Sequence, residues 1–145
     1  MYGGAAGALE PRPVAAFRGR VVALRSVAQG DTVGYGATWR AEKPASVATL
    51  GIGYADGFPR GSPSLGKEPL RREVELNGRL VPIVGRVTMD MCMVEVDKGV
   101  KLGDVATIFG GRISLDEQAR AAGTISYELL TRLGARVTRC YRTGS

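Results

Sequence analysis

Apolar residues along the chain gather into short runs of strand length, separated by polar segments rich in glycine. Residues 20–28 (RVVALRSVA), 46–54 (SVATLGIGY) and 103–110 (GDVATIFG) are such runs, and each predicts a β-strand. Residues 136–142 (RVTRCYR) predict a last strand near the C-terminus. Glycine supplies 21 of the 145 residues and lies between these runs, which is typical of turns between short strands rather than of a flexible linker.

Two other segments carry patterns that also assign side chains to the faces of a strand. In EVELNGRLVPIV, Asn77 and Gly78 favour a two-residue type I′ turn, because both residue types tolerate positive φ. Pairing across this turn places four apolar side chains on one face, which are Val74, Leu76, Val81 and Ile83. The segment TMDMCMVEV alternates with a period of two, which predicts one face with Met89, Met91 and Met93 and another with Asp90, Cys92 and Val94.

Two short helices are predicted near the C-terminus. Residues 114–117 (SLDE) fit a capping box, in which the serine bonds forward and the glutamate reaches back. This helix extends to about Ala122, and Gly123 ends it. A second helix is predicted from about Ser126 to Gly134. The sum is a mainly β fold, a small twisted barrel or sandwich of six or more short strands with two short C-terminal helices, because closure hides strand edges.

Composition narrows the class of protein without identifying it. With 145 residues, 44% of them apolar, the chain is long enough for one domain with its own core. The net charge of +6 comes with scattered arginines and few aromatic residues, a combination that disfavours nucleic-acid binding. No signal peptide and no membrane-length apolar run is predicted. Cys92 and Cys140 are predicted to be buried free thiols, as in a protein of the reducing cytoplasm.

The chain contains no histidine, which excludes common mechanisms such as the Ser-His-Asp and Cys-His types. Tyr35, between two glycines in GDTVGYGATW, is then the most unusual candidate for chemistry. A phenol has a pKa of about 10, so it needs a positive neighbour to act as a base. That neighbour must be an arginine, a lysine or a group on another chain. The alternative is that Tyr35 is only a turn residue.

Three more segments carry side chains suited to ligand binding. GIGYADGFPR places Tyr54 and Arg60 in a second glycine-rich loop, for which a wide turn with an exposed arginine is the alternative. GRVTMDMC places Arg86 and Asp90 four residues apart on one face of the predicted strand, where a surface ion pair is the alternative. GTISYELL places Tyr127 in the first turn of a helix, where backbone N–H groups favour anions such as phosphate, unless its ring only packs.

Other site signatures are missing from the sequence. It contains no metal-ligand spacing, no P-loop and no dinucleotide fingerprint. A Schiff-base lysine needs a protected pocket that lowers its pKa. The four lysines instead lie in polar, loop-like contexts, at Lys43, Lys67, Lys98 and Lys101.

Four motifs, in this order and spacing, resemble one protein family: GYGATW, GYADGFPR, PIVGRVTMDMCMVEV and GTISYELLTRLGARVTRCY. They are similar to the C-terminal domain of bacterial alanine racemase, and the resemblance spans residues 17–142. It implies a two-domain subunit, in which an N-terminal (β/α)8 barrel carries pyridoxal 5′-phosphate on a lysine and a mostly β domain follows. It also implies head-to-tail homodimers, in which the C-terminal domain of one subunit covers the barrel mouth of the other.

The resemblance implies roles for residues around the reacting atoms. Tyr35 matches the catalytic tyrosine, which exchanges a proton with the α-carbon on one face while the barrel lysine serves the other face. Met89 matches the methionine whose backbone N–H contacts the substrate carboxylate. Asp90 matches the adjacent aspartate, with a supporting role. Tyr127 matches the tyrosine that hydrogen-bonds the cofactor phosphate.

The resemblance also implies an access corridor to the active site. Tyr54 matches the tyrosine that narrows the entrance, Arg60 and Arg86 match arginines of the corridor, and Ile125 matches a corridor neighbour. The positive charge of the arginines would attract the substrate carboxylate. One departure from the family pattern is Met91, because the family usually has glutamine at this position.

The resemblance therefore predicts the C-terminal domain of a cytoplasmic alanine racemase that interconverts L- and D-alanine and supplies D-alanine for peptidoglycan. Residues 1–16 are predicted to be an extended stub from the end of the barrel domain, followed by the β domain over residues 17–145. The cofactor lysine, the arginine facing the pyridine nitrogen and the histidine–arginine pair that tunes the phenol lie outside this sequence. The isolated chain is therefore predicted to be inactive, with no metal, nucleic acid or membrane as a partner.

A small basic β-barrel that binds RNA or another protein is the alternative hypothesis. The two hypotheses predict different surfaces. A racemase domain predicts that Tyr35, Tyr54, Arg86 and Met89 converge on one rim of the fold. A binding module predicts a continuous stripe of arginines beside exposed aromatic side chains.

Overall fold

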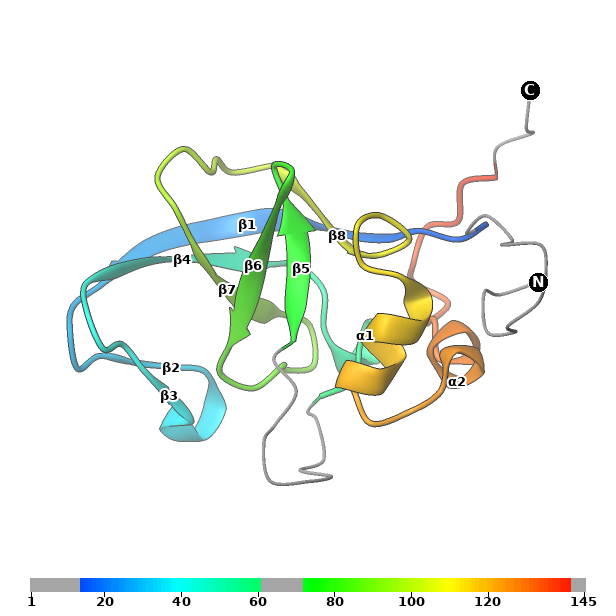
Figure 1. Ribbon diagram of the computed structural model, residues 1–145, viewed down its shortest axis with the longest axis horizontal. Helices are drawn as coiled ribbons and strands as arrows, with labels where there is room; N and C mark the ends of the chain where they lie inside the picture. Colours follow the sequence, from blue (N-terminus) through cyan, green and yellow to red (C-terminus); the bar gives the residue numbers. More distant parts are fainter. Residues whose placement is uncertain (1–13, 61–71, 142–145) are drawn as a thin grey trace.

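The computed structural model describes residues 14–60 and 72–141. Figure 1 shows them as a strand barrel with two helices at one end. The first described strand begins at Phe17. Most of the predicted stub lies outside the described residues, so the domain boundary at residue 17 stays a prediction.

Six strands of the described residues form a closed antiparallel barrel in the order β1-β4-β7-β6-β5-β8. The strands are β1 (Phe17–Val27), β4 (Ala45–Leu50), β5 (Glu73–Leu76), β6 (Arg79–Val84), β7 (Cys92–Val96) and β8 (Val105–Phe109). The long strand β1 closes the barrel, because its first part pairs with β8 and its second part with β4. The predicted fold class is confirmed, and closure pairs both edges of the sheet.

The β5–β6 hairpin forms as its turn sequence predicts. Asn77 has a φ of 50° and Gly78 a φ of 74°, which are the two positive values that a type I′ turn requires. Across the turn, Val74 pairs with Val81. The predicted inward face consists of the buried Val74, Leu76 and Val81 and the half-buried Ile83.

The core fills the barrel and continues under the helices. Phe17 and Phe109 pack at the closure of β1 on β8, with ring centroids 5.5 Å apart, and Leu50 of β4 is fully buried. A second, smaller cluster lies under the two-stranded sheet of β2 (Thr32–Val33) and β3 (Trp39–Arg40). Each large apolar side chain buried in this way contributes about 1.5–3 kcal/mol, so the barrel is a rigid scaffold for its loops.

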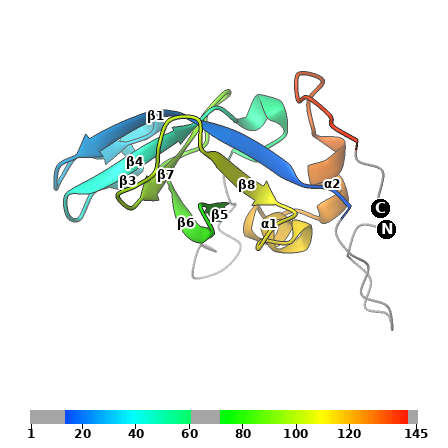
Figure 2. The same ribbon diagram turned by 90° about the horizontal axis from the view of Figure 1, so that it is seen from above.

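Helices α1 (Leu115–Ala121) and α2 (Ser126–Thr131) lie side by side at one end of the barrel (Figures 1 and 2). The predicted capping box is present, because Ser114 Oγ accepts from the Glu117 N–H at 3.1 Å and the Glu117 carboxylate accepts from the Ser114 N–H at 2.7 Å. α2 is shorter than predicted and ends at Thr131. No helix in the described part of the chain is long and apolar enough to cross a membrane.

Gln118 ties α1 to the barrel in a way that the sequence did not reveal. Its side chain is 1% exposed, and its Nε2 donates to the carbonyl oxygens of Ile108 at 2.8 Å and Glu73 at 3.2 Å. α2 is attached in turn, because the Ser126 hydroxyl donates to the Asp116 carboxylate. α1 is therefore fixed to the barrel wall, and α2 is fixed to α1.

Two predicted strands need correction. Residues 136–141 form no strand, because the barrel is already closed and offers them no edge to pair with. The segment predicted over residues 46–54 is a strand only to Leu50.

The strand predicted from TMDMCMVEV begins late, at Cys92. The four residues before it form a turn, in which the Thr88 hydroxyl donates to the Met91 carbonyl at 3.0 Å and accepts from the Met91 N–H at 3.2 Å. The prediction that Arg86 and Asp90 share one face of a strand is therefore wrong.

The two cysteines lie in different environments. Cys92 is fully buried, as predicted, and burial raises the pKa of its thiol to about 12. Cys140 is exposed, so its predicted burial is wrong. The error has the same cause as the missing strand over residues 136–141, which would have placed Cys140 in a sheet.

Candidate functional site

Two short 3-10 turns present tyrosines at the surface, η1 (Tyr35–Ala37) and η2 (Tyr54–Asp56). Tyr35 is 76% exposed and Tyr54 is 41% exposed. Gly34, with a φ of 84°, precedes Tyr35 in a conformation that L-residues rarely adopt. The glycines beside each tyrosine were the only sequence signal for these turns.

η1 packs against the segment that joins β6 to β7. A Cβ on Gly34 would lie 3.0 Å from the Arg86 backbone nitrogen and 3.1 Å from Gly85 Cα, so the two backbones are in contact. Gly85 is confined as well, because a Cβ there would lie 2.6 Å from the Val33 carbonyl oxygen. This contact holds the Tyr35 turn beside Arg86.

η2 packs against later residues of the same segment. The Tyr54 N–H donates to the Thr88 carbonyl at 3.0 Å, and the Ala55 N–H donates to the Met89 carbonyl at 2.9 Å. A Cβ on Gly53 would overlap both carbonyl groups. The segment between β6 and β7 therefore contacts both of the turns that carry tyrosines.

Arg136 joins η2 to this segment by charge. Its Nε donates to Asp56 Oδ1 at 2.7 Å, and its Nη2 donates to Asp90 Oδ1 at 2.6 Å. Hydrogen bonds to Asp56 and then Asp90 raise the pKa of Arg136. Sequence reasoning missed this residue, because it lies 80 positions from Asp56 and in a stretch predicted to be a strand.

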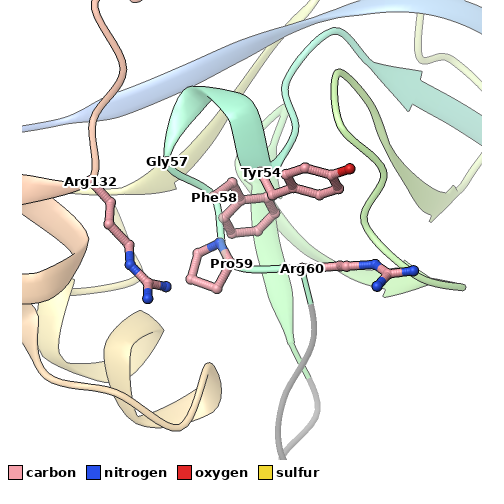
Figure 3. Close-up of a pocket in the computed structure, with 6 residues that line it drawn as sticks. All are labelled: Tyr54, Gly57, Phe58, Pro59, Arg60 and Arg132. Atoms are coloured by element: carbon pink, nitrogen blue, oxygen red, sulfur yellow. The ribbon is translucent and has the colours of Figure 1, made fainter.

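An open pocket of about 370 Å³ lies beside η2. It is lined by Tyr54, Gly57, Phe58, Pro59, Arg60 and Arg132. Figure 3 shows the Tyr54 and Arg60 side chains extending to one side of Pro59, with Arg132 on the other side. Two arginines and an aromatic ring suit a small ligand with a negative charge.

A buried arginine supports the floor of this pocket. The Arg72 guanidinium lies 4.3 Å from the Phe58 ring centroid, and its Nη1 donates to the Pro59 carbonyl at 2.8 Å. Burial lowers the pKa of Arg72 to about 10, so it stays charged at neutral pH. The sequence did not indicate that Arg72 would bond to Pro59, next to Arg60.

α2 carries the two remaining candidate residues. Ile125 directly precedes the helix and is 65% exposed, and Tyr127 lies in its first turn and is 56% exposed. The chain after α2 returns to η2, where the Gly134 N–H donates to the Asp56 carbonyl at 3.2 Å. α2 is thus linked to the same surface through its C-terminal end.

These contacts join η1, residues 85–91 and η2 to one another, and residues 132–134 after α2 contact η2. We call η1, residues 85–91, η2 and residues 125–131 the site rim. Tyr35, Tyr54, Arg86 and Met89 are exposed, and the segment that carries Arg86 and Met89 contacts the turns that carry the two tyrosines. The exposed large apolar and aromatic side chains of the site rim are Tyr35, Tyr54, Met89, Met91, Ile125 and Tyr127. A grouping of this kind is typical of an interaction surface.

The donor set of the site rim suits part of a cofactor site rather than a whole one. The exposed Tyr127 phenol is a hydrogen-bond donor suited to a phosphate group. Lys43, Lys98 and Lys101 are exposed rather than held in a pocket, and Lys67 lies outside the described residues. Within the described ranges, no group of three His, Cys, Asp or Glu residues is placed to hold a metal ion.

Sequence comparison identifies related proteins. The family described as "Alanine racemase, C-terminal domain" matches residues 14–141. The curated alanine racemase of Stutzerimonas stutzeri is 42% identical over 132 residues, which cover 90% of this chain and 35% of that protein.

Solved structures give the same result. The biosynthetic alanine racemase of Pseudomonas aeruginosa superposes with a TM-score of 0.82 and 42% identity, covering 91% of this chain and 36% of that one. The alanine racemase of Bartonella henselae with covalently bound pyridoxal phosphate superposes with a TM-score of 0.76 and 33% identity, covering 86% and 34% of the two chains. This chain thus spans about a third of the length of these relatives. It belongs to the alanine racemase family, and it corresponds to the C-terminal domain.

Proposed function

We propose that the chain works as the C-terminal domain of an alanine racemase, and that the site rim completes an active site on a barrel domain. The observation that carries the proposal is the exposed Tyr35 phenol on a turn whose backbone is packed against Gly85 and Arg86. A side chain that is exposed and yet held in place suits a group that reacts across a domain interface. Membership of the family supports the interconversion of L- and D-alanine as the reaction.

Tyr35 is one of two bases in this proposal. Its phenolic oxygen removes or returns the proton of the α-carbon on one face of alanine, and a lysine of the barrel domain serves the other face. A phenol needs a positive neighbour to do this near neutral pH. That neighbour is expected on the barrel domain, and Arg86 Nη1 also lies beside η1, 3.6 Å from the position of a Cβ on Gly36.

Met89 and Asp90 orient the substrate. The Met89 backbone N–H donates to the carboxylate of alanine, and this N–H belongs to a turn held by Thr88 and by η2. Asp90 supports the turn through its ion pair with Arg136. A fixed donor of this kind places the α-carbon without reorganisation during the reaction.

The corridor residues control access. Arg60 and Arg86 are exposed and positively charged, so they attract the carboxylate of the incoming amino acid. Tyr54 narrows the entrance beside the pocket of Figure 3. Ile125 adds an apolar wall that favours a small side chain over a charged one.

Pyridoxal 5′-phosphate is the cofactor of the proposed enzyme, and a relative's structure carries it covalently bound. When bound, it delocalises the electrons left on the α-carbon after proton removal. Tyr127 is the residue of this chain that would hold it, through a hydrogen bond from the phenol to the phosphate. The lysine that anchors the cofactor is expected on the barrel domain.

The proposed partners follow from the same assignment. They are L- and D-alanine, the barrel domain of the same subunit and that of a second subunit in a homodimer. The exposed apolar side chains of the site rim would be covered by the second subunit's barrel domain. The free cysteines suit the reducing cytoplasm, where the enzyme would supply D-alanine for peptidoglycan.

The test joins this chain to the barrel domain of the Pseudomonas aeruginosa relative, loaded with pyridoxal phosphate, and follows D-alanine formation from L-alanine. We expect racemisation by the joined protein and none by the chain alone. Tyr35→Phe should reduce kcat at least about 100-fold, because it removes a general base, and should leave the cofactor absorbance in place.

Tyr141→Phe is the matched control, because Tyr141 is 89% exposed and lies outside the site rim. It should leave kcat unchanged. A joined protein that is folded and loaded with cofactor but inactive would contradict the proposed function. A Tyr35→Phe variant with full activity would remove Tyr35 from the mechanism.

A further inference from the structure

Arg136 lies where the two turns that carry Tyr54 and Met89 meet. Its Nε and Nη2 donate to the two oxygens of Asp56, at 2.7 and 3.3 Å. Nη2 also donates to Asp90 Oδ1 at 2.6 Å and makes a longer contact of 3.5 Å with the Met89 carbonyl. One guanidinium therefore bridges three residues on two separate turns.

This arrangement differs from an ordinary surface ion pair. The Asp56 side chain is only 13% exposed, and its Oδ2 also accepts the Gly53 N–H at 2.8 Å. By contrast, the Arg79–Asp97 pair has side chains that are 73% and 78% exposed, and such pairs contribute little. A forked guanidinium on a partly buried carboxylate is geometrically specific.

The bridge also offsets a repulsion. Asp56 and Asp90 each lie within hydrogen-bond distance of the same guanidinium, so without it two carboxylates would face each other across the junction. The only other bonds described between the two turns are the two backbone bonds from Tyr54 and Ala55. Loss of the charge would therefore loosen the contact between η2 and the Met89 turn.

We propose that Arg136 is a positioning residue that fixes the Met89 turn against η2, and so sets where the substrate carboxylate binds relative to Tyr54. The proposal rests on the proposed function for the roles of Met89 and Tyr54. The bridge itself does not depend on that function. Tyr35 lies on η1, and the hydrogen bonds described for Arg136 all go to η2 and the Met89 turn, so Arg136 affects substrate binding more than proton transfer.

The first test measures amide hydrogen exchange in the 145-residue chain. In Arg136→Met, we expect exchange of the Tyr54 and Ala55 amides to be at least about tenfold faster, because their acceptors sit on the released turn. The amide of Val94 in β7 should keep its rate, which reports that the barrel stays folded. Arg79→Met is the matched control, since it removes an arginine from an exposed ion pair and should change neither turn amide.

Two further variants test the geometry of the Arg136 bridge and its bond to Asp90. Arg136→Lys retains the charge but lacks the fork, so it should recover only part of the protection. Asp90→Asn removes one arm of the bridge, and it should have a smaller effect in the Arg136→Met background than in the unmodified chain. Equal effects in both backgrounds would overturn the bridge.

The second test uses the joined racemase described above. Arg136→Met should raise KM for alanine about tenfold and change kcat less than about threefold. A loss confined to kcat, or unchanged exchange at Tyr54 and Ala55, would overturn the proposal. If the unmodified joined protein does not racemise alanine, the proposed function fails, while the exchange result still decides whether Arg136 fixes the Met89 turn.

Discussion

The hairpin turn between β5 and β6 and the contact between η2 and the Met89 turn use glycine for different purposes. In the hairpin turn, Gly78 has a φ of 74°, and nothing lies within 4 Å of the position a Cβ would take. At η2, Gly53 has an ordinary extended backbone with a φ of −145°, yet a Cβ there would overlap Thr88 and Met89. Gly78 allows the backbone conformation of a turn, and Gly53 allows two chain segments to pack closely.

The difference shows how the site rim is held. A hairpin turn needs only the right local dihedral angles. It therefore does not fix the position of any other loop. Backbone contact at the site rim couples η2 to the Met89 turn, and contact at Gly85 couples the same segment to η1. The residues of the proposed site are therefore placed by packing between loops, which the closed barrel carries as a scaffold.

Gly53→Ala should break the site-rim contact and have the largest effect. The added methyl group meets backbone atoms, which cannot move aside as a side chain does, so we expect a loss of about 3 kcal/mol in the free energy of unfolding. Urea unfolding followed by circular dichroism measures it. A loss below about 1 kcal/mol would mean that η2 does not depend on close contact with the Met89 turn.

Gly78→Ala should test the hairpin turn between β5 and β6, with a smaller effect. Alanine in this left-handed conformation costs about 1 kcal/mol, and no contact adds to it. The same urea experiment gives the value, and racemisation by the joined protein should be unchanged. A cost that equals that of Gly53→Ala would remove the distinction between the two glycines.

The smallest expected effect is a loss of stability at low pH near the β5–β6 hairpin. Asp104 accepts hydrogen bonds from the Lys101 N–H at 3.0 Å and from Asn77 Nδ2 at 2.8 Å, and these bonds, in that order, hold its pKa below the ordinary value. Because the pKa of Asp104 is lower in the folded state than in the unfolded state, its ionised carboxylate stabilises the fold. This stabilisation is fully present above the unfolded pKa of about 4, and it is lost as the pH falls through the pKa of the folded state.

We therefore expect the urea midpoint of the chain to fall between pH 6 and pH 3, and to fall less in Asp104→Asn. Exchange at the amides of the β5–β6 hairpin should show the same dependence. A fall of equal size in Asp104→Asn would assign the pH dependence to other carboxylates.

Local signals in the sequence were sufficient for much of the barrel. The Asn77–Gly78 turn, the inward face of its hairpin and the Ser114–Glu117 capping box are confirmed, because each depends on residues within a few positions of one another. The glycines around Tyr35 predicted a loop that presents its phenol, and the structure has Tyr35 exposed on a turn, whereas Met89, predicted in a strand, lies in the turn before β7. Their roles in catalysis stay predictions.

The errors share a cause in long-range contacts. Residues 136–142 have the composition of a strand, but strand formation needs a free edge, and barrel closure removes it. The bond from Arg136 to Asp56 and the bond from Gln118 to Glu73 join residues 80 and 45 positions apart, so no local pattern reveals them.

The sequence by itself determined elements whose residues are neighbours along the chain: most of the barrel strands, the hairpin turn and the first helix. Only the tertiary structure decided which loops meet, because contact between Gly53 and the Met89 turn depends on how β4, β6 and β7 are ordered around the barrel. Pairing order is set by the total burial and closure of the sheet rather than by any one segment. The loops of the site rim meet because the barrel closes in this order.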